Sequence, residues 1–121
     1  MKMTQKQAIE AYKVIRKLEY QDMPGATAMM IFRTRKALEP QFEFQDGEER
    51  KALESLGAKI NDIGIIDFPD GDAQQKYIDK MEEIGEIEVE VNLKKQTIDI
   101  TDLKLNAKDI EALETIMEIV C

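Results

Sequence analysis

Apolar residues recur at helical spacing over the first twenty positions of the chain. They lie three and four residues apart on one stripe, while the basic residues of this segment lie on the opposite face. The stripe comprises Ala8, Ala11, Tyr12, Ile15 and Leu18. Thr4 precedes it and is a residue type favoured at helix N-caps. The pattern predicts an amphipathic helix from Thr4 to about Tyr20.

A second apolar stripe follows a turn at residues 21–25. Its members are Ala28, Ile31, Phe32, Arg35 and Leu38, and Met29 and Met30 widen it. We expect this helix to run from about Pro24 to Glu39, because the residue before a proline avoids the α region and Pro40 comes next. The short turn predicts that the two helices pack antiparallel as a helical hairpin.

Shorter elements are predicted in the middle of the chain. We expect Asp46 to cap a third helix that stops at Gly57, with Ala52, Leu53 and Leu56 on its apolar face. The β-branched run at residues 60–68 predicts one short strand. We expect Asp72 to cap a fourth helix that ends at Gly85 and turns Ala73, Tyr77, Met81 and Ile84 inward.

Strict alternation of apolar and acidic residues marks the segment from Glu86 to Leu93 as a strand. Residues 97–101 repeat the pattern, and the three-residue link between the two segments favours a β-hairpin. Asn106 and Asp109 form an N-cap pattern for a last helix over residues 107–119, with Ile110, Leu113, Met117 and Val120 inward.

The element order predicts an α+β fold in a single domain over residues 1–121. It has an N-terminal antiparallel helical hairpin, further short helices, a small antiparallel β-hairpin and a C-terminal helix. The length suits one domain with its own core, without disulfides or metal.

Charge is divided unevenly along the chain. Residues 1–36 hold eight Lys/Arg against three acids, a balance of +5, and residues 37–121 hold nine against 22, a balance of −13. The formal net charge of −8 repels the phosphate backbone, so we expect no direct binding to duplex nucleic acid.

Three stretches carry a resemblance to a known family. They are IFRTRKALEPQFEF with EERKALESLGAK, then YIDKMEEIGEIEVEVNLKKQTIDITDL, then NAKDIEALETIMEIV. Over most of residues 28–120, their order is similar to a family of small uncharacterised proteins encoded by phages and prophages of Gram-positive bacteria, a domain of unknown function. The resemblance implies an accessory or assembly protein of a phage gene cluster, and it transfers no catalytic residues.

Few residue types suited to catalysis are present. The chain has no histidine, one serine and one cysteine, which argues against zinc sites and against nucleophiles paired with histidine. No glycine-rich phosphate-binding motif occurs. Asp67, Asp70 and Asp72 fail the calcium-loop pattern because Tyr77 stands where a glutamate is needed, and a turn with a helix cap is favoured over a weak cation site. We expect no enzymatic activity, cofactor or metal.

The expected location is the cytoplasm of the host cell. Cys121 has no partner for an intramolecular disulfide, the N-terminus lacks the apolar core of a signal peptide, and no apolar run approaches the length of a membrane span.

Basic residues near the end of the second helix are the candidates for anion recognition. Arg33, Arg35 and Lys36 could bind a nucleotide or another small anion, joined by Arg16 and Lys17 across the hairpin. The alternative is a solvated basic face that complements the helix dipole. Met29, Met30 and Phe32 are candidate interface residues, because a helix that is apolar on more than one stripe is buried on several sides.

These features favour a small non-enzymatic phage accessory or assembly protein that acts by binding a phage or host protein and that forms homo-oligomers. The alternative is a phage-encoded inhibitor of host antiviral defence, acting as an acidic nucleic-acid mimic or by sequestering a nucleotide signal. We expect no membrane association.

Overall fold

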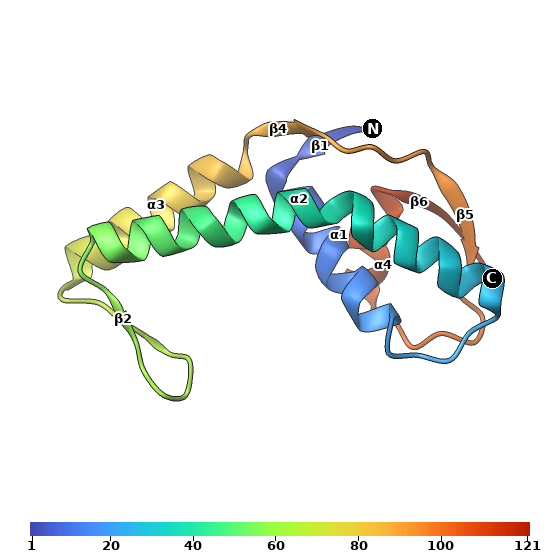
Figure 1. Cartoon of the computed structure of the whole chain (residues 1–121), viewed down its shortest axis with the longest axis horizontal. Helices are drawn as coiled ribbons and strands as arrows, with labels where there is room; N and C mark the ends of the chain where they lie inside the picture. Colours follow the sequence, from blue (N-terminus) through green and yellow to red (C-terminus); the bar gives the residue numbers. More distant parts are fainter.

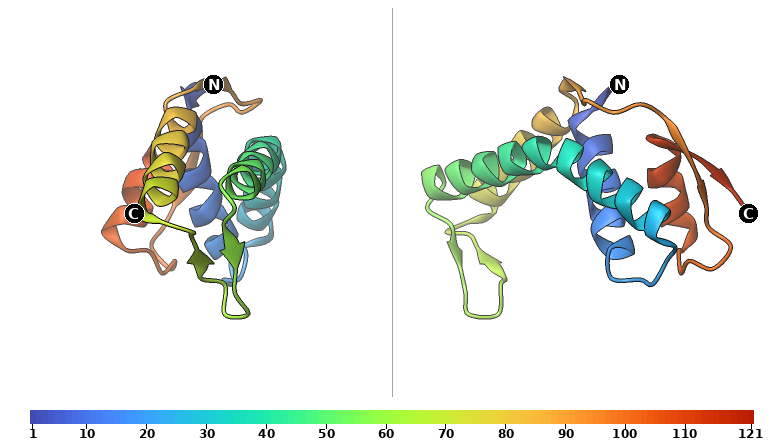
Figure 2. Two further views of the ribbon diagram at one scale, coloured as in Figure 1. Left: turned by 90° about the vertical axis from the view of Figure 1, so that its left-hand side faces the viewer. Right: turned by 45° about the vertical axis from the view of Figure 1, so that its right-hand side comes forward.

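One long helix organises the chain. In the computed structural model, which describes residues 1–121, α2 (Gly25–Ser55) packs its first half against α1 (Gln5–Leu18) and its second half beside α3 (Gly71–Gly85) (Figure 1). α1 in turn packs on α4 (Ala107–Glu114). We call residues 41–85 the arm, because the second half of α2 and α3 extend together away from the rest, and we call the remainder the head (Figure 2).

The hydrophobic core lies in the head. Fourteen buried residues form one cluster there, contributed mainly by α1, the first half of α2 and the segments after residue 90. The arm buries only four apolar residues, and all four lie outside this cluster: Ala52, Leu53, Ala73 and Ile84. The arm is therefore a pair of helices held by a thin apolar seam.

The strands form three separate two-stranded pairs. β1 (Lys2–Thr4) pairs antiparallel with β4 (Glu88–Glu90), and β2 (Lys59–Ile60) pairs antiparallel with β3 (Ile66–Asp67) at the end of the arm. β5 (Gln96–Asp99) pairs in parallel with β6 (Met117–Val120), and α4 makes the crossover between them. With four helices and these small sheets, the fold is α+β, as the sequence predicts.

The first helix and its antiparallel partner are confirmed. Thr4 caps α1 with a full capping box: the Gln7 backbone N–H donates to the Thr4 hydroxyl at 3.1 Å, and the Thr4 N–H donates to the Gln7 side chain at 2.9 Å. Glu19, just after α1, meets Arg35, whereas Gln5 at its start meets Gln41. The two helices therefore run in opposite directions.

The predicted stop at Pro40 is wrong. α2 continues through Pro40 to Ser55, so the predicted third helix from Asp46 is its second half, although its end at Gly57, with φ +69°, is correct. The Gln5 side-chain amide donates to the Gln41 carbonyl at 2.8 Å, and the Tyr12 and Phe42 rings stack at 4.6 Å. These contacts lie just after the proline, and Leu38, fully buried in the core cluster, lies just before it, so α2 is held on both sides of Pro40.

The predictions for the strands, the cap of α3 and the last helix need four corrections. Residues 60–68 form a β-hairpin rather than one strand, and Asp70 rather than Asp72 caps α3. Segments 86–93 and 97–101 pair with β1 and β6 instead of with each other. The helix predicted over 107–119 ends at Glu114, and residues 117–120 form β6 instead, which leaves Val120 exposed.

Candidate functional site

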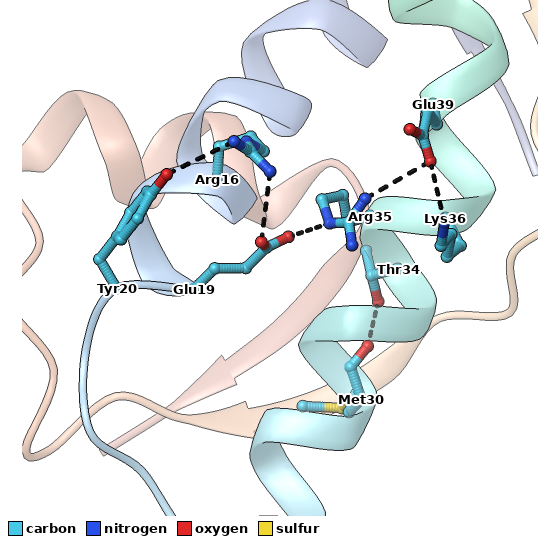
Figure 3. A network of polar contacts seen from close by, with 8 residues as sticks. All are labelled: Arg16, Glu19, Tyr20, Met30, Thr34, Arg35, Lys36 and Glu39. Carbon is cyan, nitrogen blue, oxygen red and sulfur yellow. Dashed lines mark hydrogen bonds and ion pairs between the residues drawn. The ribbon is translucent and has the colours of Figure 1, made fainter.

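The cations proposed for anion binding lie mostly in a network of ion pairs between α1 and α2 (Figure 3). Arg35 contacts the Glu19 carboxylate through its Nε, and its Nη1 lies 3.4 Å from Glu39 Oε2. Arg16 lies 3.4 Å from the same Glu19, and Lys36 lies 3.7 Å from Glu39. Arg35 is 16% exposed, so its charge is partly desolvated and is compensated by two carboxylates.

Lys17 is directed to a different partner. Its Nζ lies 2.6 Å from Asp109 Oδ2 at the start of α4. Arg33 alone among the five predicted cations has no ion-pair partner, and it is exposed. Four of the five cations are thus already ion-paired within the chain, with three carboxylates between them, so the structure adds no support to a shared anion pocket at these residues.

The Lys17–Asp109 contact changes the titration of that carboxyl group. Partial burial raises the pKa of Asp109, but hydrogen bonds from Lys17 and from the Asn106 N–H, together with the Lys17 charge, outweigh it and leave the pKa below its usual value. Asp109 also serves in the capping box of α4. The pair therefore joins α1 to α4 at the point where α4 begins.

Replacing Asp109 with asparagine is expected to make the free energy of unfolding fall less steeply as the pH is lowered into the acid range. Because its folded pKa is lowered, Asp109 stabilises the protein above its unfolded pKa of about 3.9, and this contribution is lost as the pH falls through the folded value. The free energy of unfolding, measured in urea from pH 7 to pH 2.5, should fall less steeply in Asp109→Asn. A matched control is Lys94→Gln, since Lys94 has no ion-pair partner; an equal slope in Asp109→Asn and wild type would contradict the assignment.

Two of the three candidate interface residues lie on the surface. Met29 and Phe32 are 49% and 47% exposed, whereas Met30 is partly buried against the core cluster. Met29, Phe32, Arg33 and Lys36 follow one another at helical spacing, and we call them the basic stripe. The guanidinium of Arg35 and the ammonium of Lys36 lie 5.4 and 5.8 Å from the Phe32 ring centre.

The most exposed apolar cluster was missed by sequence reasoning. Ile60, Ile63 and Ile65 are 62%, 78% and 58% exposed on the β2–β3 hairpin, and we call them the hairpin tip. The hairpin stands at the far end of the arm from the core (Figure 1). The Asn61 side chain accepts hydrogen bonds from the N–H groups of Ile63 and Ile65, and Gly64 adopts φ +83°. The Asn61–Asp62 pair followed by Gly64 was the available signal for a turn.

Most of the net negative charge lies on the arm. Residues 41–85 hold 12 Asp/Glu against five Lys/Arg, a balance of −7, whereas the rest of the chain holds 13 against 12. The charge division seen along the sequence thus becomes a division in space between an acidic arm and a nearly neutral head.

Several acidic residues in the segments 67–72 and 86–90 have structural partners. Glu90 pairs with the N-terminal amine at 3.0 Å and Glu88 with Lys2 at 3.9 Å. Asp70 accepts a hydrogen bond from the Ala73 N–H as the cap of α3. No group of three or more acidic or sulfur side chains converges as a metal site.

The largest cavity, about 720 Å³, lies between α1 and the arm. Lys6 and Lys13 line it together with Glu10, Glu82 and Glu86, so its charges are mixed. Burial and then the nearby Glu49 raise the pKa of Tyr77 on its wall. This groove favours no single class of charged ligand.

Comparisons with known proteins yield no relative: no family model, no curated protein and no solved structure matches the chain. None of its helices combines the length and apolar character that a membrane span requires.

Proposed function

We propose that the protein is a non-enzymatic accessory or assembly protein that acts by protein–protein contact, and that the hairpin tip is its principal contact. The observation that carries the proposal is the gathering of three large apolar side chains, all more than half exposed, within six residues of a projecting hairpin. Single exposed apolar residues are normal on protein surfaces, whereas clustered ones mark interaction sites. The phage setting rests on the sequence resemblance.

The geometry of the tip suits insertion into an apolar pocket of a partner. Full burial of a side chain such as isoleucine contributes about 1.5–3 kcal/mol, so the three residues together supply roughly 5 kcal/mol before the costs of association. The backbone of the turn is held by Asn61, which limits the ordering cost on binding.

Replacing Ile60, Ile63 and Ile65 together with serine is expected to abolish capture of the partner from infected host cells. The matched control changes Ile78, Ile87 and Val120, which are 41–43% exposed outside the hairpin, to serine. Quantitative mass spectrometry of co-purified proteins should show the same partner with wild type and control and a loss of at least tenfold with the hairpin variant. Equal recovery with the hairpin variant would refute the role of the tip.

A second function, inhibition of host defence by an acidic nucleic-acid mimic, is favoured by the charge of the arm. The 15 arm residues of α2 span about 22 Å, over which duplex DNA carries about 13 negative charges. The arm carries a net −7 and so has about half that charge. In the same capture experiment, a nucleic-acid mimic would still capture its partner when the three isoleucines of the hairpin tip are changed to serine. It would lose the partner when Glu54, Asp79 and Glu83 are changed to their amides.

A further inference from the structure

The basic stripe and the hairpin tip are complementary to each other. Both combine exposed large apolar side chains with charge, but the signs are opposite. The stripe offers Arg33 and Lys36 beside Met29 and Phe32; Arg33 has no ion-pair partner, and Lys36 is exposed and lies 3.7 Å from Glu39, which it shares with Arg35. The hairpin that carries the tip holds Asp62 and Asp67 in addition to the acidic cap of α3, against the single cation Lys59. Each surface thus has the properties that the other would bind.

These two surfaces do not meet within one chain. The 23 residues from Arg33 to Ser55 form one continuous helix and separate the stripe from the hairpin by about 35 Å. The hairpin also lies at the opposite end of the molecule from the first half of α2 (Figure 1). Any contact between the stripe and a hairpin tip is therefore a contact between two copies of the chain.

We propose that the hairpin tip of one copy docks on the basic stripe of a second copy. A cavity of about 200 Å³ lies beside Phe32; Met23, Ala28 and Ile31 form its apolar wall, and Glu19 and Gln21 complete its lining. Its size and its apolar wall suit one isoleucine side chain of the tip, while Asp62 and Asp67 approach Arg33 and Lys36. The inference rests on the proposed function, because it assigns a partner to the same protein-binding tip.

Charge also selects this arrangement over the alternatives. A symmetric dimer through the stripe would place Arg33 and Lys36 against the same residues of the other copy, and like charges across an interface oppose association. The acidic residues of the hairpin likewise oppose its insertion into an anionic membrane. One tip-to-stripe contact leaves a free tip and a free stripe on the pair. A reciprocal second contact closes a two-fold dimer, and otherwise the contact is heterologous and propagates into a ring or a filament.

The test uses two variants that each remove one half of the contact. Phe32→Asp alters the stripe and Ile63→Asp alters the tip. Light scattering should show a mass that rises with concentration above 13.9 kDa for wild type and monomers for each variant alone. An equimolar mixture should form a dimer and stop there, because only one intact tip and one intact stripe can meet. A mixture that stays monomeric, or a wild type that is monomeric at several hundred micromolar, would overturn the proposal.

A charge exchange tests the same contact at residues whose side chains are exposed. Arg33→Glu should weaken self-association at least tenfold, and Asp62→Lys in the same chain should restore it; a double variant no better than Arg33→Glu contradicts the pairing.

The outcomes also separate the two proposals. A monomeric wild type that still loses its cellular partner on serine substitution of the tip overturns only self-docking. Self-association without tip-dependent capture of another protein overturns only the wider proposed function.

Discussion

Replacing Leu38 with alanine is expected to lower the free energy of unfolding by about 3 kcal/mol. Leu38 is fully buried and belongs to the core cluster between α1 and α2. Truncation removes apolar contact and leaves a cavity that the surrounding helices fill only in part, which explains the size of the effect. A domain of this size has a total stability of about 5–15 kcal/mol, so the loss is a large share of it.

The loss at Leu38 can be measured by urea unfolding followed by circular dichroism. The matched control is Ile78→Ala on α3, where the side chain is 41% exposed and the expected change is below about 0.5 kcal/mol. A change below about 1 kcal/mol in Leu38→Ala would mean that the interface between α1 and α2 is not part of the stabilising core.

Replacing Pro40 with alanine is expected to raise the free energy of unfolding by about 2 kcal/mol. A proline inside a helix is about 3 kcal/mol less favourable than alanine, because it lacks the N–H that would bond to the carbonyl four residues earlier. That carbonyl belongs to Lys36, which is exposed. Part of the gain is offset, because alanine leaves the unfolded chain about 1 kcal/mol more conformational freedom.

The control for Pro40 is Pro24→Ala. Pro24 stands at the N-cap of α2, where no helical hydrogen bond is lost, so its replacement gains nothing in the helix and should lower the free energy of unfolding by about 0.4–1 kcal/mol through the freer unfolded chain. Thermal and urea unfolding of the two variants give the comparison. If Pro40→Ala left the free energy of unfolding unchanged or lowered it, Pro40 would not destabilise α2, and the prediction would be wrong.

The same proline explains where sequence reasoning reached its limit on the helices. Local signals are reliable where neighbouring residues satisfy one another, as in the capping boxes of Thr4 with Gln7 and of Asn106 with Asp109. At Pro40 the local preference against a helix is overcome by contacts with residues about 30 positions away, including the stacking of Tyr12 on Phe42. Those partners are not visible in a local window of sequence.

Strand pairing shows the same limit. The alternation around Val89 and Val91 correctly indicates an extended segment with one face inward. β4 in this segment pairs with β1, more than 80 residues earlier, and β5 pairs with β6, which follows α4. A short link favours a β-hairpin only if no other strand competes for pairing. Here the two segments pair with β1 and β6 instead of with each other, and Val91 and Ile98 each pack in the core.

The sequence by itself determined the fold class, the caps of α1 and α4, the inward faces of α1 and α3, and the charge imbalance, because these follow from residue type and spacing. Only the tertiary structure decided what the candidate residues do. Whether Arg35 is exposed or ion-paired depends on where Glu19 and Glu39 lie. Whether the isoleucines at 60–65 are buried in a core or exposed as a contact surface depends on what packs on them. Both depend on packing between distant segments, which residue spacing does not encode.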